Sequence, residues 1–227
     1  MPVRKIKKSY RAVTGLIASY DGSQFQYESS LERDLLIILH FLSSRTVERF
    51  EEQPVKIKFN CGSGPPRTYT LDALVHFRGD SYLRHCSIDK PWLIETKYRK
   101  ELRNSWTKLR PRFRAATRFA MQSGFYFHLL TEQHIRTELL RTARFLRPFR
   151  RVPYEPNLAR AILDCVDKMD APTPHKVLSQ LAGADETARL TLLPHIWRLL
   201  ALGELAMNLH QALTPKTPLW VVRPEVE

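Results

Sequence analysis

The first third of the chain carries a stripe of apolar residues at helical spacing. Its members lie three or four positions apart, which predicts a helix over residues 27–42. Ser43 and Ser44 follow directly and are expected to end this helix. The stripe consists of Leu31, Leu35, Ile38, Leu39 and Leu42.

Strand patterns follow this helix. Residues 55–59 alternate apolar and basic positions, as in a half-exposed strand, and residues 68–77 are rich in β-branched and aromatic types. Residues 82–86 are expected to pair with the latter strand. Two further segments, 92–96 and 125–130, are mostly apolar and predict strands buried in a sheet.

Two helical segments alternate with the last of these strands. Residues 99–122 read as helical, with Pro111 expected to start a new helix or kink this one. Thr131 is a candidate N-cap for a helix ending near residue 145, with His134 at the N3 position. The resulting order predicts an α/β fold in which helices flank one mixed sheet.

The C-terminal third has a different pattern. Three helices are expected over 157–169, 173–181 and 186–202, with Asn157 and Thr173 as N-caps and Gly203 closing the last. Two short strand-like segments, 204–209 and 218–222, come next. Three helices followed by a β-hairpin predict a winged-helix domain.

Prolines at 148, 153 and 156 are typical of a linker between these parts. We therefore expect a basic N-terminal arm (1–26) with little structure of its own, an α/β domain (27–152) and a winged-helix-like domain (153–227).

Charge is distributed unevenly along the 227 residues, whose formal net charge is +13. Up to Glu155 there are 29 Lys and Arg against 15 Asp and Glu, whereas the remainder has 7 against 8. The densest stretch, Lys97 to Arg118, has nine basic residues and one acidic residue. A solvated helix face usually mixes both signs, so this excess favours binding of a nucleic acid through its phosphates.

Composition indicates the class of protein and its cellular compartment. A hydrophobic fraction of 43% and a charged fraction of 26% are ordinary for a globular protein. No apolar run approaches the ~18 residues of a membrane helix, and none follows the basic N-terminus as in a secretory signal. Three dispersed cysteines form no CxxC pair, which disfavours a zinc site or a disulfide framework. We expect a cytoplasmic protein that does not bind membranes.

Three carboxylates and one lysine are candidates for chemistry. Glu32 lies at the edge of the first helix stripe, with Glu28 one turn earlier. Asp72 lies within the predicted strand 68–77. Glu95 lies at the end of the predicted strand 92–96, and Lys97, two residues later, points to the same side. Carboxylate oxygens brought together in this way are ligands for Mg²⁺, which polarises a phosphate and lowers the pKa of an attacking water. Lys97 can orient that water or stabilise the charge that develops on phosphorus.

Structural roles are the alternative for each of these residues. Glu95 and Lys97 can form an exposed ion pair of little energetic value, and Glu32 can be a boundary residue of an amphipathic helix. Asp72 can lie beyond the end of its strand. An isolated ExK is a weak signal, but a helix Glu, a strand Asp and an ExK strand, followed by a basic helix and an apolar strand, form a much more specific combination.

This combination resembles the PD-(D/E)xK nuclease core of restriction endonucleases and resolvases. More narrowly, residues 20–150 resemble the TnsA endonucleases of heteromeric cut-and-paste transposons, and the C-terminal part is similar to their C-terminal domain. The segments that carry the resemblance are Tyr27-Glu-Ser-Ser-Leu-Glu-Arg-Asp34, Phe50-Glu-Glu-Gln-Pro54, Arg67-Thr-Tyr-Thr-Leu-Asp72, Leu93-Ile-Glu-Thr-Lys97 and Leu130-Thr-Glu-Gln-His-Ile135. Leu71 departs from the family, which often has Pro before the Asp.

The resemblance implies a restriction-endonuclease-like fold and specific residue roles. Glu32, Asp72 and Glu95 would hold Mg²⁺, for which Mn²⁺ substitutes, together with the backbone carbonyl of Thr96, and Lys97 would be the catalytic lysine. Glu28 is the weaker candidate for the helix position. The residues implied in DNA contact are Arg99, Lys100, Arg103, Lys108, Arg110, Arg112 and Arg114.

The resemblance also implies a role in DNA transposition. The protein would cut the 5′ ends of the transposon, while a DDE transposase, TnsB, cuts and joins the 3′ ends under control of an AAA+ regulator, TnsC. The near-neutral charge of residues 156–227 fits contact with a protein better than strong DNA binding. Two other functions stay open: a stand-alone restriction- or resolvase-like nuclease, and a non-catalytic winged-helix DNA-binding adaptor.

Overall fold

The computed structural model describes residues 14–18, 24–60, 65–78 and 90–223. Contacts divide the chain into two compact units, Met1–Arg136 and Thr137–Glu227. The strand expected over 82–86 lies outside the described residues, as do residues 1–13 of the expected arm.

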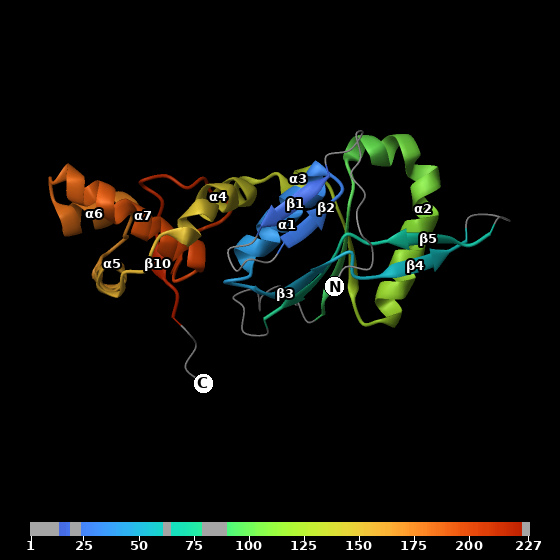
Figure 1. Ribbon diagram of the computed structural model, residues 1–227, viewed down its shortest axis with the longest axis horizontal. Helices are drawn as coiled ribbons and strands as arrows, with labels where there is room; N and C mark the ends of the chain where they lie inside the picture. The colour runs from blue at the N-terminus through green and yellow to red at the C-terminus, as the bar shows by residue number, and fades with distance from the viewer. Residues whose placement is uncertain (1–13, 19–23, 61–64, 79–89, 224–227) are drawn as a thin grey trace. The chain divides into compact units, whose positions relative to one another are not determined.

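The first unit is built on a mixed four-stranded sheet, as the sequence predicts. Its strand order is β3-β6-β7-β8, with β7 and β8 parallel and the other pairs antiparallel. Helices α1 and α2 lie on opposite sides of this sheet (Figure 1). The bounds are α1 Ser30–Leu42, β3 Val47–Glu52, β6 Ala73–Phe77, β7 Trp92–Thr96, α2 Arg99–Gln122 and β8 Tyr126–Leu130.

The strand predicted over 68–77 is in fact two strands in two different sheets. Its first half, β5 (Arg67–Thr70), pairs only with β4 (Lys56–Phe59) in a separate hairpin. At the break, the Leu71 N–H donates to the Val55 carbonyl (3.3 Å), whereas the Asp72 N–H donates to the Ile94 carbonyl of β7 (3.1 Å). Asp72 therefore lies where the chain passes from one sheet to the other. Its side chain does not have to follow the alternation between two sheet faces that residues within a strand show.

Two further differences concern the N-terminal half. Residues expected to form an unstructured arm include an antiparallel pair, β1 (Gly15–Ala18) with β2 (Gln24–Tyr27), so the prediction is wrong for these residues. Strand β3 was not predicted, because its sequence Val-Glu-Arg-Phe-Glu-Glu exposes three charged side chains at the sheet edge.

The long helix α2 bends at a different place from the expected one. Ser105 has non-helical angles (φ −129°, ψ 16°), six residues before Pro111, which itself lies inside the helix. The helix predicted after Thr131 is two helices, α3 (Glu132–Ile135) and α4 (Glu138–Leu146). Its expected cap is present, since the Thr131 N–H donates to Nδ1 of His134 (3.0 Å).

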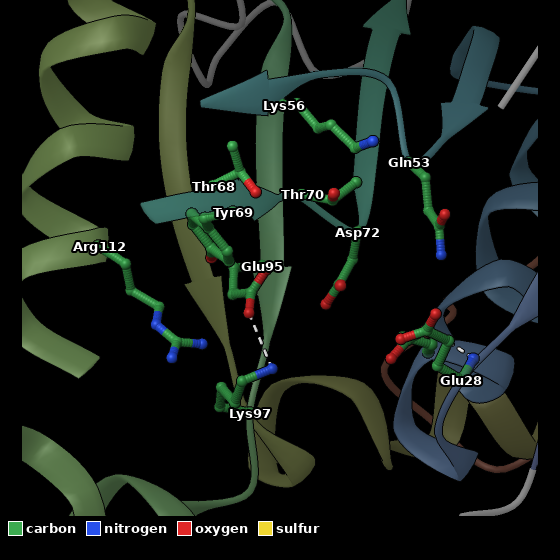
Figure 2. Close-up of a pocket in the computed structure, with 11 residues that line it drawn as sticks. Glu28, Gln53, Lys56, Thr68, Tyr69, Thr70, Asp72, Glu95, Lys97 and Arg112 are labelled. Atoms are coloured by element: carbon green, nitrogen blue, oxygen red, sulfur yellow. Dashed lines mark hydrogen bonds and ion pairs between the residues drawn. The ribbon is translucent and has the colours of Figure 1, made fainter. Parts of the chain in front are cut away.

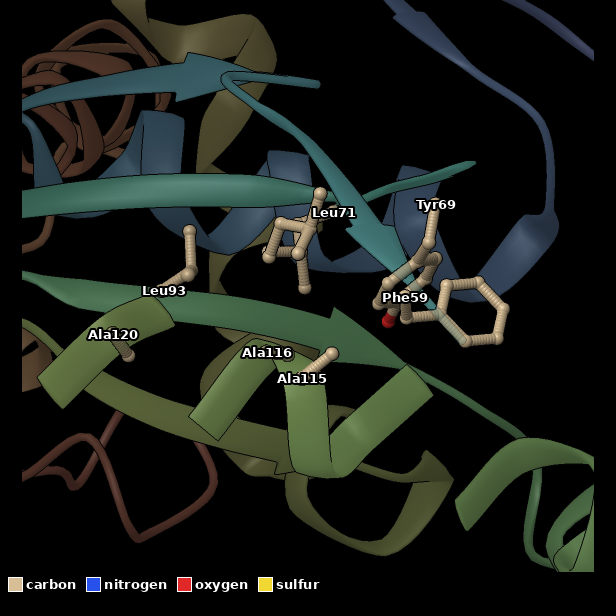
Figure 3. Packing of buried hydrophobic residues seen from close by; sticks show 8 residues of the cluster. Phe59, Tyr69, Leu71, Leu93, Ala115, Ala116 and Ala120 are labelled. Atoms are coloured by element: carbon tan, nitrogen blue, oxygen red, sulfur yellow. The ribbon is translucent and has the colours of Figure 1, made fainter. Parts of the chain in front are cut away.

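One apolar cluster fixes α2 against the strands that carry the acidic residues (Figure 3). Small residues on α2 allow close approach to Leu93 of β7 and Leu71, both fully buried, and to the β4–β5 hairpin. The cluster contains Ile57, Phe59, Tyr69, Leu71, Leu93, Ala115, Ala116 and Ala120.

The second unit is mostly helical. Helix α4 and the 3-10 helix η2 pack on α7, so the structural division falls between residues 136 and 137, not at the expected boundary at 152/153. Within this unit, the buried Arg150 donates from Nε to the Ala201 carbonyl (3.1 Å). The bounds are η2 Arg147–Arg151, α5 Pro156–Lys168, α6 Pro174–Ala182, α7 Glu186–Leu202, β9 Leu205–Ala206 and β10 Trp220–Val221.

Helix ends in this unit largely follow the predicted signals. Thr173 caps α6 by accepting from the Lys176 N–H (3.3 Å), and Gly203 ends α7 in the left-handed conformation (φ +83°). Asn157 is not an N-cap, because α5 begins at Pro156 after Glu155. Strands β9 and β10 pair antiparallel after α7.

No helix among the described residues is both long and apolar enough to cross a lipid bilayer.

Candidate active site

A polar pocket of about 430 Å³ opens where β7, the β4–β5 hairpin, α1 and α2 come together (Figure 2). It collects all four candidate catalytic side chains, from positions far apart in the sequence. The residues lining it are Glu28, Glu32, Gln53, Lys56, Thr68, Tyr69, Thr70, Asp72, Glu95, Lys97 and Arg112.

Asp72 is fixed in this pocket by the end of β7. Its Oδ2 accepts hydrogen bonds from both the backbone N–H and the hydroxyl of Thr96, each at 2.7 Å. Two short bonds to one carboxylate oxygen orient the group and leave Oδ1 available to a ligand. The sequence suggested Thr96 only through its carbonyl, but its amide and hydroxyl hold the neighbouring acid.

Glu95 and Lys97 form a close ion pair inside the pocket. Lys97 Nζ lies 2.8 Å from Glu95 Oε1 and donates to the Thr96 carbonyl at 3.0 Å. The Glu95 side chain is 2% exposed and that of Lys97 18% exposed, so this is not the solvent-exposed pair considered from sequence. The ammonium thus contacts two groups that the sequence assigned to a metal ion.

Glu32 reaches the pocket from the first turn of α1. Ser29 caps the helix by accepting from the Glu32 N–H (3.1 Å), and Glu32 Oε2 accepts from the Glu28 N–H (2.8 Å). This reciprocal pairing is close to a capping box, and it turns the Glu32 side chain back toward the helix start. Glu28 lies beside it in the same pocket.

The acids disfavour each other's charge. Burial and then repulsion from Asp72 raise the pKa of Glu32 to about 7 and that of Glu95 to about 8. Burial also raises the pKa of Asp72, although Lys97 opposes this. For Lys97, burial lowers the pKa, but attraction to Glu95 and Asp72 outweighs it, so the pKa is raised and the amine stays protonated.

These features fit a hard divalent cation. Glu95 Oε2 is buried without a hydrogen-bond partner among the described residues, and an acidic group in that state is stabilised by a cation. No three Asp, Glu, His or Cys side chains in the described parts of the chain are close enough to hold an ion as they stand. Magnesium requires only one or two carboxylates, and Asp72 and Glu95 can supply these. Water and phosphate oxygens complete its coordination.

The basic residues suggested for DNA contact occupy two positions. Lys100, Arg103 and Lys108 are exposed on α2, as are Arg110 and Arg114, while Arg99 is half-buried. Arg112 instead turns its half-buried guanidinium into the pocket, 5.5 Å from the centre of the Tyr69 ring.

Sequence reasoning missed several pocket residues. Gln53 and Tyr69 lie in segments that carry the family resemblance and Lys56 lies in a predicted strand, but nothing local to these residues indicated a role in the site. The Tyr69 hydroxyl is buried and has no hydrogen-bond partner among the described residues, although it lies near enough to lower the pKa of Glu95. Only the three-dimensional crossing of β5 over β7 brings it there.

A second missed group supports the segment that follows Lys97. The buried Asp34 of α1 accepts from Nε of Arg136 (3.0 Å), and Nη2 of Arg136 donates to the Tyr98 hydroxyl (2.8 Å). Ser30 completes the group through Tyr98 (2.7 Å). These contacts tie α1 and the end of α3 to the junction between β7 and α2.

Comparison with known proteins agrees with this geometry. Residues 44–132 match the family described as TnsA-like endonuclease N terminal, a span that includes Asp72, Glu95 and Lys97 but not Glu32. No curated protein matches the chain.

Proposed function

Because residues 44–132 match the family described as TnsA-like endonuclease N terminal, we propose that the protein is a divalent-metal-dependent DNA endonuclease that cuts the 5′ ends of a transposon within a transposase complex. The observation that carries the proposal is the pocket itself. Asp72 and the Glu95–Lys97 pair come from two separate points of the chain within the matched span, and Glu32 joins them from α1.

Each of these residues has a distinct role in the proposed hydrolysis. Asp72 and Glu95, with Glu32 facing them, would hold Mg²⁺, which would supply Lewis-acid polarisation of the phosphate and an activated water. Lys97 stabilises the negative charge that develops on the phosphate oxygens. Its ammonium lies 2.8 Å from Glu95 Oε1, beside the acids that would hold the ion.

DNA is proposed to approach along α2. The exposed basic residues of this helix supply sequence-independent contacts to phosphates, which position the duplex without reading its bases. The uncompensated positive charge of residues 1–155 supports this placement.

The second unit is proposed to bind the partners. Three helices, α5 to α7, followed by the β9–β10 pair support a winged-helix arrangement. With 7 basic and 8 acidic residues after position 155, this part suits a protein surface better than a DNA backbone. The proposed partners are a TnsB-type DDE transposase and a TnsC-type AAA+ regulator.

Cleavage assays test the function directly. We expect nicking or cutting of transposon-end DNA in Mg²⁺ or Mn²⁺, none in EDTA, and a loss of at least about a hundredfold in rate for Glu95→Ala and Lys97→Ala. Cleavage that is unaffected by both substitutions would remove the proposed site.

Adding the partners separates the related functions. Cutting that requires the transposase from the same element supports a subunit of a transposase complex. Equal cutting without it would show a stand-alone nuclease, and metal-independent binding with no cutting in either case would show a DNA-binding adaptor.

A further inference from the structure

Buried polar atoms without partners are concentrated around the pocket. Of the six such side-chain atoms found among the described residues, four belong to residues that line it. Folded proteins pair nearly all buried polar groups, so an unpaired set facing one cavity indicates a polar ligand. The four atoms are Gln53 Oε1, Tyr69 Oη, Glu95 Oε2 and Arg112 Nε.

Two of these atoms can donate hydrogen bonds. Tyr69 Oη carries a hydroxyl hydrogen and Arg112 Nε an N–H, and Arg112 has no hydrogen bond or ion pair within the part of the chain that the structure describes. Its guanidinium instead lies over the Tyr69 ring, with 5.5 Å to the centroid. The two donors therefore belong to one local group that is poised for an anion.

Acidic and basic groups occupy different parts of the pocket. In Figure 2, Arg112 and Tyr69 lie beside Glu95 and Lys97, while Glu28 lies on the far side, beyond Asp72. The acidic side suits a cation and the Arg112 side suits a phosphate, with Lys97 close to both. A phosphodiester at the reacting position would place its charged oxygens between these two parts.

From this arrangement we infer that Arg112 and Tyr69 form a phosphate-binding subsite that holds the reacting phosphate of the DNA during cleavage and retains it on the product. The inference rests on the proposed endonuclease function and assigns these two residues a role distinct from the backbone contacts of the exposed α2 residues. In hydrolysis, the water oxygen bonds to phosphorus, the 3′ oxygen of the neighbouring nucleotide leaves with a proton, and the product keeps a terminal 5′-phosphate in this subsite.

A purely structural role for Tyr69 does not require its hydroxyl. The ring packs in the apolar cluster that holds α2, and phenylalanine would fill the same volume without leaving a buried donor unpaired. Tyr69→Phe therefore separates the two roles, since it keeps the packing and removes only the donor.

Duplexes that differ at one terminus provide the test. The affinity of the full-length protein is measured in Mg²⁺ for a duplex ending in a 5′-phosphate and for the same duplex ending in a 5′-hydroxyl. We expect the phosphate to raise wild-type affinity about tenfold, the size of a charge-assisted hydrogen bond. In Arg112→Ala this ratio should fall close to one, and in Tyr69→Phe it should fall about two- to threefold.

Arg114→Ala is the matched control, because Arg114 is exposed two positions further along the same helix. It should weaken binding of both duplexes equally and so keep the ratio of the wild type. Thermal unfolding of each variant verifies that the ratios are compared on folded protein.

The subsite is overturned if the wild type does not distinguish the two duplexes, or if Arg112→Ala keeps the full ratio. Cleavage of transposon-end plasmid by the wild type together with the partner transposase, with Glu95→Ala as the inactive reference, is measured in parallel. Metal-dependent cleavage with an unchanged ratio refutes the subsite alone, whereas absence of cleavage even with the transposase present refutes the proposed function.

Discussion

Thr96 illustrates how one side chain can determine the position of a catalytic group. Its hydroxyl donates to Asp72 Oδ2 at 2.7 Å in a buried setting, where a bond to a charged acceptor is worth about 1.5–3 kcal/mol. Thr96→Val keeps the shape but removes this donor. We expect a loss of about 1–3 kcal/mol in the free energy of unfolding, measured with urea, and slower DNA cleavage.

Thr96→Ser provides the comparison, because serine retains the hydroxyl. It should keep most of the cleavage rate, with a smaller loss of stability from the missing methyl group. Equal rates for the valine and serine variants would show that the hydroxyl does not position Asp72.

Glu32 should make the protein less stable as the pH rises. Its folded-state pKa of about 7 lies above the ordinary glutamate value of 4.5, so the folded protein binds the proton more tightly than the unfolded chain. Stability attributable to this group is therefore complete below pH 4.5 and is lost as the pH rises through 7. Glutamine at this position still offers an acceptor to the Glu28 N–H and carries no charge.

We accordingly expect Glu32→Gln to raise the free energy of unfolding in EDTA by about 1–3 kcal/mol at pH 8 and to change it little at pH 4.5. Urea titrations at both pH values measure the difference. A Glu32→Gln variant that is less stable than the wild type at pH 8 would contradict the assigned charge repulsion.

At the scale of secondary-structure elements, Arg136 holds three of them together. It bridges Asp34 of α1 to Tyr98, the residue between β7 and α2, from the C-terminal end of α3. Arg136→Leu removes the closer of two arginine contacts to the buried Asp34 carboxylate, since Arg33 lies at 3.3 Å and Arg136 at 3.0 Å. Because Arg136 is 43% exposed, we expect a moderate loss of about 1–3 kcal/mol in stability.

Arg141→Leu serves as the control for this substitution. Arg141 is 77% exposed and pairs with Glu138 one turn away in α4, so its loss should change stability by less than about 0.5 kcal/mol. The Arg136 assignment fails if both variants unfold at the same urea concentration as the wild type.

The same scale separates what the sequence could predict from what it could not. Local signals indicated the periodic apolar stripe of α1, the apolar run of β7 and Gly203 at the end of α7, and the structure places the ends of these elements at or within a few residues of the expected positions. Residues 68–77 were predicted as one strand because apolar and β-branched residues lie on both sides of the break at Leu71 and Asp72. Only hydrogen bonding to two different neighbours shows that the sheet changes there.

The candidate site was predictable to the extent that local signals existed. A carboxylate within a strand and an ExK at the end of another indicated Asp72, Glu95 and Lys97 as a group, and the structure places them in one pocket. Tyr69 and Arg112 have no such signal, because a tyrosine in a strand and an arginine in a basic helix are common. Their shared feature, a buried donor without a partner, exists only in three dimensions.

At the scale of the whole molecule, the net charge differs sharply between the two parts of the chain. The basic excess falls within residues 1–155, and exposed members of it lie on α2. Binding to duplex DNA releases about 0.9 counterions for each phosphate contact, so the dependence of affinity on salt counts those contacts. The salt dependence of DNA affinity can therefore show which part of the intact protein contributes the phosphate contacts.

The comparison uses two triple variants that lower the net charge equally. One replaces Lys100, Arg103 and Lys108 of α2 by alanine, and the other replaces Arg160, Lys168 and Lys216, which are exposed in the second unit. For the α2 variant we expect the slope of log affinity against log salt to fall in magnitude by about 2–3. The second variant should keep the slope of the wild type, because a loss of net charge outside the proposed DNA contacts changes the affinity without removing contacts. Equal slopes for the two variants would show that DNA does not lie along α2.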